Sequence, residues 1–112
     1  MTGCYQVVTT TDSEAEATRI AETLVTNQLA ACAQVTGPVA SVYRWHGAIE
    51  RASEWLCTAK TTELRLPEVL ERIRALHSYQ QPEIVAMPIS AGDQEYLDWI
   101  RRESTPSGRS DE

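Results

Sequence analysis

His77 is the side chain in this sequence that is best suited to bind a transition metal. A neutral imidazole is a common ligand of copper and zinc. The other histidine, His46, falls at a predicted turn and is expected to be solvated. A single imidazole with neutral neighbours holds such a metal poorly. The structural alternative is that His77 caps the helix predicted before it, because a partial positive charge is favourable near a helix C-terminus.

The three cysteines are a second group that could bind a metal. Cys4, Cys32 and Cys57 are odd in number, widely spaced and contain no C-x-x-C pair. This pattern favours reduced, buried thiols in a cytoplasmic protein over a disulfide framework. The first residues also lack the basic and apolar segments that are typical of a secretory signal. We therefore expect a cytoplasmic protein.

Charged and aromatic residues in the middle of the chain could form a binding cleft. Glu54 and Lys60 lie six residues apart, on the same side of a predicted strand. With Glu83 they form either ion pairs between subunits, which we favour, or a polar cleft for an anionic or zwitterionic ligand. Tryptophans more often pack than stack on ligands. The candidates for such a cleft between subunits are Tyr43, Trp45, Glu54, Lys60, Tyr79, Glu83 and Trp99.

Composition and motifs argue against several functional classes. The 112 residues carry a formal net charge of −6, which disfavours binding of nucleic acid through its phosphates. The chain has no apolar run long enough to cross a membrane. It also has no glycine-rich phosphate loop, no G-x-S-x-G and no pair of histidines on a helix. We expect a non-enzymatic protein that binds neither nucleic acid nor membranes.

The elements that must position these residues alternate regularly along the chain. Strands are predicted at 5–10, at 31–35 continuing past Gly37-Pro38 into 39–46, at 54–60 after a turn at Gly47, and at 83–89. Ser13 and Glu16 fit a capping box at the start of the first helix. A second helix begins around Pro67, with an apolar stripe of Leu66, Leu70, Ile73 and Leu76. A third, short helix follows Asp93 and is expected to bury Tyr96, Leu97 and Ile100.

This order of elements predicts an α+β fold of the ferredoxin-like, split β-α-β type. An antiparallel sheet would carry two helices on one face, with an extra C-terminal helix. Residues 1–103 form one domain. Residues 104–112, rich in Ser, Pro, Gly and charge, are expected to form a disordered tail.

The predicted hairpin at 31–60 is unusually long. Each arm reaches roughly twice the usual five or six residues of a strand. A hairpin that carries Trp45 and Trp55 cannot lie entirely over the core of one small domain. Its far end would expose unpaired backbone groups and large aromatic side chains. We therefore expect an obligate oligomer in which the hairpin pairs with another copy of the chain.

The sequence resembles the CutA divalent-cation-tolerance family from about Gln6 to Arg102. No single fragment is specific, but their order and spacing together are. The fragments are Leu29-Ala-Ala-Cys32, Tyr43-Arg-Trp-His-Gly47, Ala59-Lys60-Thr61, His77-Ser-Tyr79, Pro82-Glu83-Ile84 and Gly92-Asp-Gln-Glu-Tyr96-Leu-Asp-Trp99.

The resemblance implies a homotrimer whose long hairpins wrap neighbouring subunits, with an architecture like that of the PII signalling proteins. In copper-binding relatives the ligands are a cysteine at the end of the first strand and two adjacent histidines. Here Thr9 and Leu76 stand at two of these positions, and only His77 remains. The resemblance therefore implies weak copper binding at best.

We therefore expect a non-enzymatic homotrimer that is linked to the tolerance of divalent metal ions. No cofactor is certain, although copper, another divalent cation or a small molecule could bind weakly in clefts between subunits. The alternative is a PII-like sensor, in which a small metabolite in the cleft alters contacts with another protein.

Overall fold

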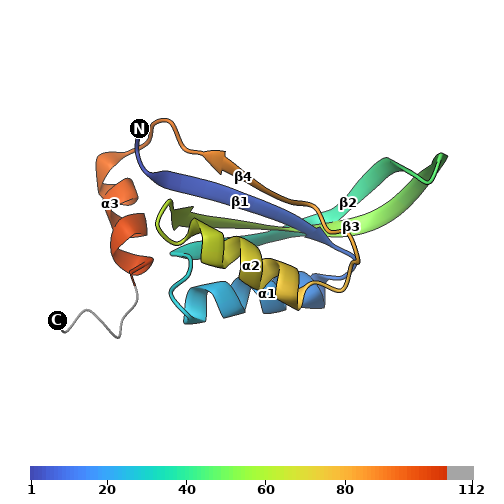
Figure 1. The fold of residues 1–112 in the computed structure, drawn as a ribbon, viewed down its shortest axis with the longest axis horizontal. Coiled ribbons are helices and arrows are strands. Elements are labelled where there is room, and N and C mark those ends of the chain that lie inside the picture. Colours follow the sequence, from blue (N-terminus) through green and yellow to red (C-terminus); the bar gives the residue numbers. More distant parts are fainter. Residues whose placement is uncertain (106–112) are drawn as a thin grey trace.

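The computed structural model describes residues 1–105 and forms a four-stranded sheet with three helices (Figure 1). The elements, in chain order, are β1 (Cys4–Thr11), α1 (Glu14–Thr26), β2 (Cys32–Trp45), β3 (Ala48–Thr62), α2 (Leu66–Leu76), β4 (Ile84–Pro88) and α3 (Gln94–Glu103).

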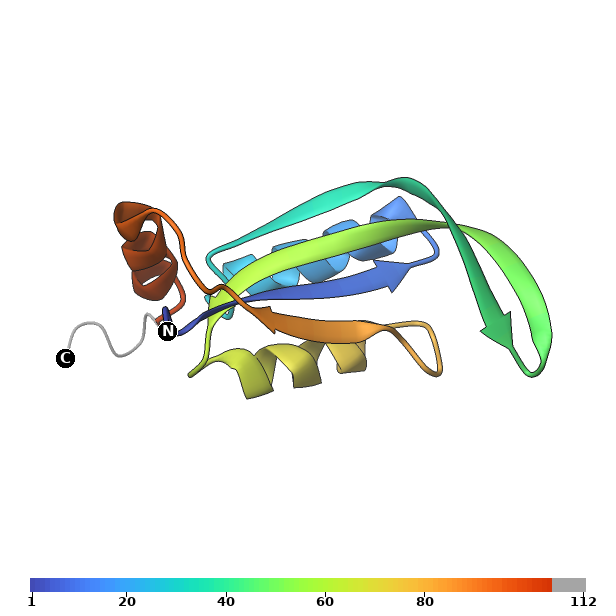
Figure 2. The same cartoon turned by 90° about the horizontal axis from the view of Figure 1, so that it is seen from above.

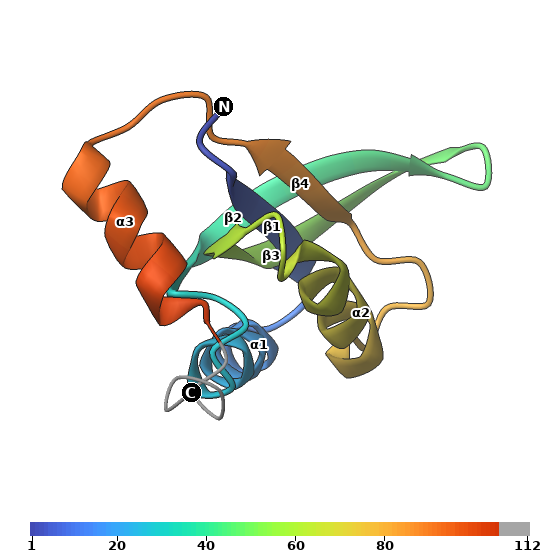
Figure 3. The same cartoon turned by 60° about the vertical axis from the view of Figure 1, so that its left-hand side comes forward.

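The sheet is antiparallel with the strand order β2-β3-β1-β4. The helices α1 and α2 lie side by side on one face of the sheet, and α3 packs at the end where β1 begins (Figures 2 and 3). This arrangement confirms the predicted ferredoxin-like fold with an additional C-terminal helix. None of the helices within residues 1–105 is long and apolar enough to cross a membrane.

The core lies between the sheet and the two helices. Along α1, Ala17, Ile20, Ala21 and Leu24 recur at helical spacing and are all buried. Burying a side chain such as Ile20 or Leu24 contributes about 1.5–3 kcal/mol to stability. On α2 the fully buried residues are Val69, which the predicted stripe omitted, and Ile73; Leu66, Leu70 and Leu76 pack around them.

The helix starts follow the predicted capping residues. Ser13 Oγ accepts a hydrogen bond of 3.1 Å from the backbone N–H of Glu16. Asp93 caps α3 by accepting from the N–H of Tyr96 at 3.0 Å. Pro67 lies in the first turn of α2. Each such cap satisfies a donor that the helix itself leaves unpaired.

The hairpin of β2 and β3 turns through two residues with positive φ, His46 at 50° and Gly47 at 82°. Two positive φ values in a two-residue loop suit the right-handed twist of the paired strands. The register shifts between Thr36 and Val39, where Gly37 lies against Trp55; a Cβ on Gly37 would come within 2.6 Å of that indole. Gly37 therefore allows the tryptophan to cross the strand at the bulge.

The far half of the hairpin extends beyond the helices (Figure 1). Its large side chains are exposed in the single chain, with Val42 at 64 %, Ile49 at 50 % and Trp45 at 41 %. The outer edge of β2 pairs with no other strand among residues 1–105. The structure thus confirms that the hairpin is long and that its far end is uncovered in the single chain.

The third helix differs in part from its prediction. Leu97 and Ile100 are buried against Cys4 and Ala31, as expected. Tyr96, which was also expected to be buried, is 41 % exposed, and its ring stacks on Trp99 at a centroid distance of 5.6 Å. The tail was expected from residue 104, but Ser104 is buried as the C-cap of α3. Most of the predicted tail, 106–112, lies outside the described residues.

Candidate functional site

An open cleft of about 480 Å³ lies between the hairpin and the loop that precedes β4. Most of the side chains expected from the sequence to form a cleft meet here. The lining residues are Thr10, Ser41, Val42, Tyr43, Trp45, Glu54, Tyr79, Gln80, Gln81 and Glu83.

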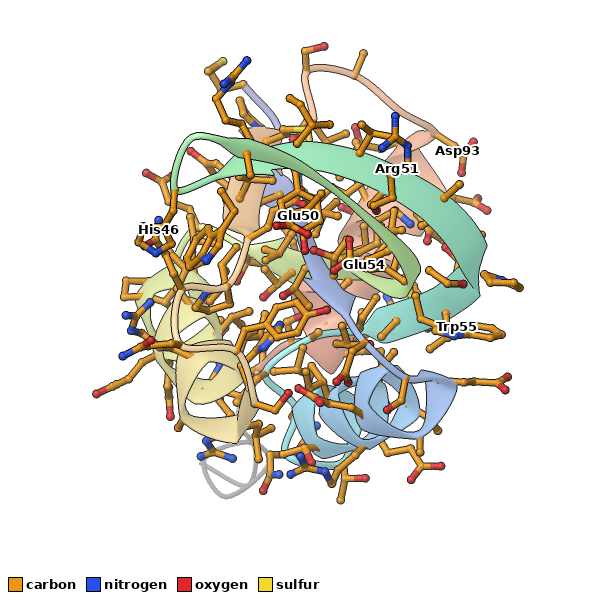
Figure 4. The ribbon with its side chains drawn as sticks, turned by 90° about the vertical axis from the view of Figure 1, so that its right-hand side faces the viewer. His46, Glu50, Arg51, Glu54, Trp55 and Asp93 are labelled. Carbon is orange, nitrogen blue, oxygen red and sulfur yellow. The ribbon has the colours of Figure 1, made fainter. Side chains whose placement is uncertain are left out.

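The register of the hairpin places the cleft residues on one of its faces. Residues that are directly opposite in neighbouring strands project to the same side, and so do alternate residues within a strand. Tyr43 is opposite Glu50, and Val39 is opposite Glu54. Tyr43, Trp45 and Glu54 therefore share the side that faces the cleft. Figure 4 shows Glu50 and Glu54 beneath the curved hairpin, with Arg51 on its other side.

Glu54 and Tyr79 form the central polar contact of the cleft. The phenol of Tyr79 donates a 2.7 Å hydrogen bond to Oε2 of Glu54, whose residue is only 8 % exposed. Burial, the hydrogen bond to Glu54 and the charge of Glu54 raise the pKa of Tyr79 well above its usual value of 10. The phenol therefore keeps its proton, and the carboxylate remains its acceptor.

Glu83 forms the opposite wall of the cleft, where the loop meets the end of β1. Its Oε1 accepts a 3.2 Å hydrogen bond from the hydroxyl of Thr10, and its backbone carbonyl accepts one of 2.7 Å from Thr9. Among the described lining residues there are two carboxylates and no lysine or arginine. The cleft of one chain is thus acidic and aromatic, which does not suit the anionic ligand that was considered from the sequence.

His77 lies behind the cleft with its side chain fully buried. The backbone N–H of Tyr79 donates to Nδ1 at 3.2 Å, and Nε2 lies 2.8 Å from the carbonyl oxygen of Thr10. These partners assign the proton to Nε2, which then donates to Thr10. Both ring nitrogens are therefore engaged. His77 occupies the C-cap position of α2, as predicted, but it caps the helix through its backbone N–H and not through a positively charged ring.

Glu16 also holds the loop that contains Ser78 and Tyr79, a role that was not predicted from the sequence. Its carboxylate, in a residue that is 8 % exposed, accepts hydrogen bonds of 2.8 Å from both the N–H and the hydroxyl of Ser78. The predicted capping box is therefore only half formed, because the Glu16 carboxylate binds Ser78 instead of the N–H of Ser13. The two residues are 62 positions apart, so no local sequence signal connects them.

Two of the cleft candidates lie elsewhere in the chain. Lys60 donates to Oε1 of Gln34 at 3.4 Å and lies roughly 20 Å along β3 from Glu54, at about 3.3 Å per residue. Trp99 belongs to α3 and packs on the cluster that contains Cys4 and Ile100. Neither residue can reach the cleft of its own chain.

Residues 1–105 contain no group of three or more His, Cys, Asp or Glu side chains that could hold a metal ion. The three cysteines are free thiols; Cys4 and Cys57 are buried and Cys32 is partly buried. Burial raises the pKa of the Cys57 thiol to about 11, which disfavours the thiolate that binds soft metals.

Comparison with known proteins identifies close relatives. The family model of the CutA1 divalent ion tolerance protein matches residues 5–103. The "Divalent-cation tolerance protein CutA" of Thermus thermophilus is 46 % identical over 95 residues, which cover 85 % of this chain and 92 % of the relative.

Solved structures agree with this relationship. The T. thermophilus Cut A1 structure superposes with a TM-score of 0.86 at 44 % identity, covering 89 % of this chain and 97 % of that one. The CutA structure from Xylella fastidiosa gives a TM-score of 0.89 at 35 % identity, covering 92 % and 99 %. The family model and the T. thermophilus relative are named for tolerance of divalent cations and not for a catalytic activity. The chain therefore belongs to the CutA1 divalent ion tolerance protein family.

Proposed function

We propose that the protein is a non-enzymatic homotrimer that acts in the tolerance of divalent metal ions and binds a small ligand or a weakly held cation in clefts at its subunit boundaries. The exposed far half of the hairpin carries this proposal. Val42, Ile49 and Trp45 are 41–64 % exposed in the single chain, which is unfavourable unless another molecule covers them.

The hairpin has two different faces, and this supports a closed ring. Register places Val42 opposite Arg51 and Arg44 opposite Ile49, so that one face is apolar and basic. The other face carries Tyr43, Trp45, Glu50 and Glu54. Contact between unlike faces of identical chains is heterologous, and such contacts form rings when the rotation closes. A trimer is the smallest ring that such contacts form without two-fold symmetry.

Sedimentation of the purified full chain tests the assembly. The unmodified protein is expected to be a trimer at micromolar concentration. Ile49→Lys places a charge on the apolar face of the hairpin and should shift the equilibrium toward monomer. Leu64→Lys is the matched control, because Leu64 is 85 % exposed in the turn after β3 and should leave assembly unchanged. A folded monomer of the unmodified chain at micromolar concentration would refute the trimer.

Metal binding at the cleft is proposed to be weak and to use carboxylate oxygens. Glu54 and Glu83 are hard donors, which suit Mg²⁺ or Mn²⁺ better than copper. Titration of chelator-stripped protein with Mn²⁺ should show weak binding that Glu54→Gln reduces. Tight binding that survives this substitution would place the metal elsewhere.

A PII-like sensor is the second candidate. A ligand in the cleft would touch both the hairpin and the loop around Tyr79. Its binding could therefore change the position of one element relative to the other. Native mass spectrometry of freshly purified protein separates the candidates, since a bound metabolite favours the sensor and a bound metal ion favours direct metal handling. Turnover of the bound molecule would instead indicate an enzyme.

We propose a cytoplasmic location, which the free thiols support. A solved relative from Archaeoglobus fulgidus is named a periplasmic protein, so cell fractionation is a necessary test.

A further inference from the structure

We infer that His77 is a proton-operated switch of the loop that precedes β4. When the buried ring gains a proton at Nδ1, it exchanges the backbone N–H of Tyr79 for the carboxylate of Glu16. This inference goes beyond the proposed function. It depends neither on the trimer nor on a ligand, because the polar partners of the ring all belong to its own chain.

The neutral ring holds the loop through the lone pair of Nδ1. The backbone N–H of Tyr79 donates to this nitrogen at 3.2 Å, while Nε2 donates to the carbonyl of Thr10 at 2.8 Å. Neutral imidazole has one donor nitrogen and one acceptor nitrogen, so these two bonds use both of them. The side chain of His77 is fully buried. The Tyr79 N–H therefore keeps this acceptor only while Nδ1 is unprotonated.

The protonated ring has a different partner already in place. Oε2 of Glu16 lies 3.5 Å from Nδ1. Imidazolium donates through both nitrogens, so Nδ1–H would face the N–H of Tyr79, donor against donor, and would turn to the Glu16 carboxylate instead. Oε2 already accepts the N–H of Ser78 at 2.8 Å, but a carboxylate oxygen accepts more than one hydrogen bond. Glu16 can thus receive the new donor without releasing Ser78, and the bond that is lost is that of Tyr79.

Glu16 is ionised in the pH range in which a histidine switch operates. Histidine side chains change charge between about pH 5 and 8. Burial opposes ionisation of Glu16, but Ser78 donates to it twice and its pKa lies below 4.5. The carboxylate is therefore available to Nδ1–H throughout this range.

The other charged groups near the ring are held elsewhere or lie further out. The guanidinium of Arg19 donates to the carbonyl of Leu76 at 3.1 Å, and Arg74 is exposed in the last turn of α2. Glu16 is the carboxylate in contact with the ring. The titratable and charged groups around His77 are Glu16 and Arg19 from α1, Arg74 from α2 and Tyr79 from the loop, with Asp12, Glu54 and Glu83 one contact further away around Tyr79 and Thr10.

The switch acts on the residue that links the loop to the hairpin. The phenol of Tyr79 donates to Glu54 at 2.7 Å, and its ring lies beside that of His77 at a centroid distance of 5.0 Å. Release of the Tyr79 N–H removes the backbone anchor next to this phenol. Two alternative sets of hydrogen bonds around one buried group form a two-state element that a proton biases.

Nuclear magnetic resonance of the full-length protein tests the switch directly. At about pH 8 the nitrogen shifts of the His77 ring should show a protonated Nε2 and a bare Nδ1. As the pH falls to about 5, Nδ1 should gain a proton, and the amide signal of Tyr79 should shift with the same midpoint. The hydrogen-exchange protection of that amide, corrected for the pH dependence of intrinsic exchange, should fall by about fivefold to tenfold, as expected for the loss of one hydrogen bond.

Three substitutions identify the groups that take part. Glu16→Gln removes the charge that receives Nδ1–H and should lower the midpoint of the ring by about one pH unit. Glu14→Gln makes the same change of charge at an exposed position and should leave the midpoint nearly unchanged. His77→Asn keeps a side-chain acceptor for the N–H two residues on, as asparagine commonly provides, but cannot be protonated. Its Tyr79 amide should stay protected at both pH values.

The titration of the unmodified protein decides the inference even if a variant fails to fold. The inference is overturned if Nδ1 stays unprotonated down to about pH 5, or if the Tyr79 amide does not follow the titration of the ring. It is also overturned if the Tyr79 amide of His77→Asn still responds to pH, because another group would then be the sensor. These signals are read without added ligand, so they are independent of the tests of the proposed function.

Discussion

The phenol of Tyr79 donates a 2.7 Å hydrogen bond to the carboxylate of Glu54 and so joins the loop before β4 to the strand β3. The contact spans 25 residues of sequence and lies where the hairpin leaves the body of the fold. It determines which oxygen of Glu54 remains available in the cleft.

Tyr79→Phe should destabilise the protein by about 1–3 kcal/mol, because it leaves a nearly buried carboxylate without its donor. Urea unfolding at a fixed protein concentration measures the effect. Tyr5→Phe is the matched control, since Tyr5 is partly buried in β1 and its hydroxyl makes no hydrogen bond within residues 1–105. Equal effects of the two substitutions would contradict a specific role for the contact with Glu54.

Stability should depend on pH through Glu16. Burial acts to raise the pKa of Glu16, but the two hydrogen bonds from Ser78, together with the positive charge of Arg19, outweigh it and lower the pKa below 4.5. A carboxyl group with a lowered pKa in the folded state stabilises that state fully above about pH 4.5. This contribution is lost as the pH falls through the lower, folded-state pKa.

Glu16→Gln should therefore cost about 1–3 kcal/mol at pH 7, with a difference from the unmodified protein that shrinks at pH 3. Glu14→Gln is the control, because Glu14 is exposed in the same first turn of α1. Unfolding by urea at the two pH values provides the measurement. A difference that grows on acidification would show that the sign of the Glu16 contribution is wrong.

The three cysteines should react at different rates with a thiol reagent such as Ellman's reagent. Cys4 and Cys57 are each 1 % exposed, and the pKa of Cys57 is raised to about 11 by burial. Cys32 is partly buried, with its Sγ 3.6 Å from the hydroxyl of Tyr96. Cys32 should thus react first in the native protein, and Cys32→Ser should remove this fast phase. Rapid reaction of all three thiols without denaturant would contradict the packing around Cys4 and Cys57.

Copper(II) should bind weakly, and His77→Ala should change its affinity by less than about threefold, because both ring nitrogens are engaged in the fold. His46→Ala should have the larger effect on residual binding, since His46 is exposed at the hairpin turn. The His77 variant should instead lose thermal stability. Nanomolar copper binding that His77→Ala abolishes would establish a metal site at His77.

The elements of the fold could be predicted from the sequence because their signals are local. The spacing of Ile20 and Leu24 identifies the buried face of α1, and Ser13 and Asp93 cap the helices that they were predicted to cap. His77 was likewise predicted as a helix cap from its position alone.

The side-chain hydrogen bonds of the site could not be predicted, because they depend on which loop packs against which strand. Glu54 and Lys60 do share a side of β3, as a period of two requires, but six residues of strand separate them by roughly 20 Å, so the two side chains cannot line one cleft of a single chain. Glu16 was assigned to its own helix start, whereas the fold supplies Ser78 as a better partner. Tyr96 has helical spacing with Ile100, which α3 buries, yet the Tyr96 ring stacks on Trp99 and stays 41 % exposed.

The position of β1 in the sheet has a consequence for the order in which the protein can fold during synthesis. The first strand of the chain obtains its two neighbours from residues 48–62 and 84–88. A nascent chain that ends before β4 therefore cannot pair the second edge of β1, because the strand that pairs with this edge has not yet been synthesised. Pairings this distant in sequence are slow to form, because the intervening loop must close first. We expect this polypeptide to reach its native state only after nearly all of it has left the ribosome.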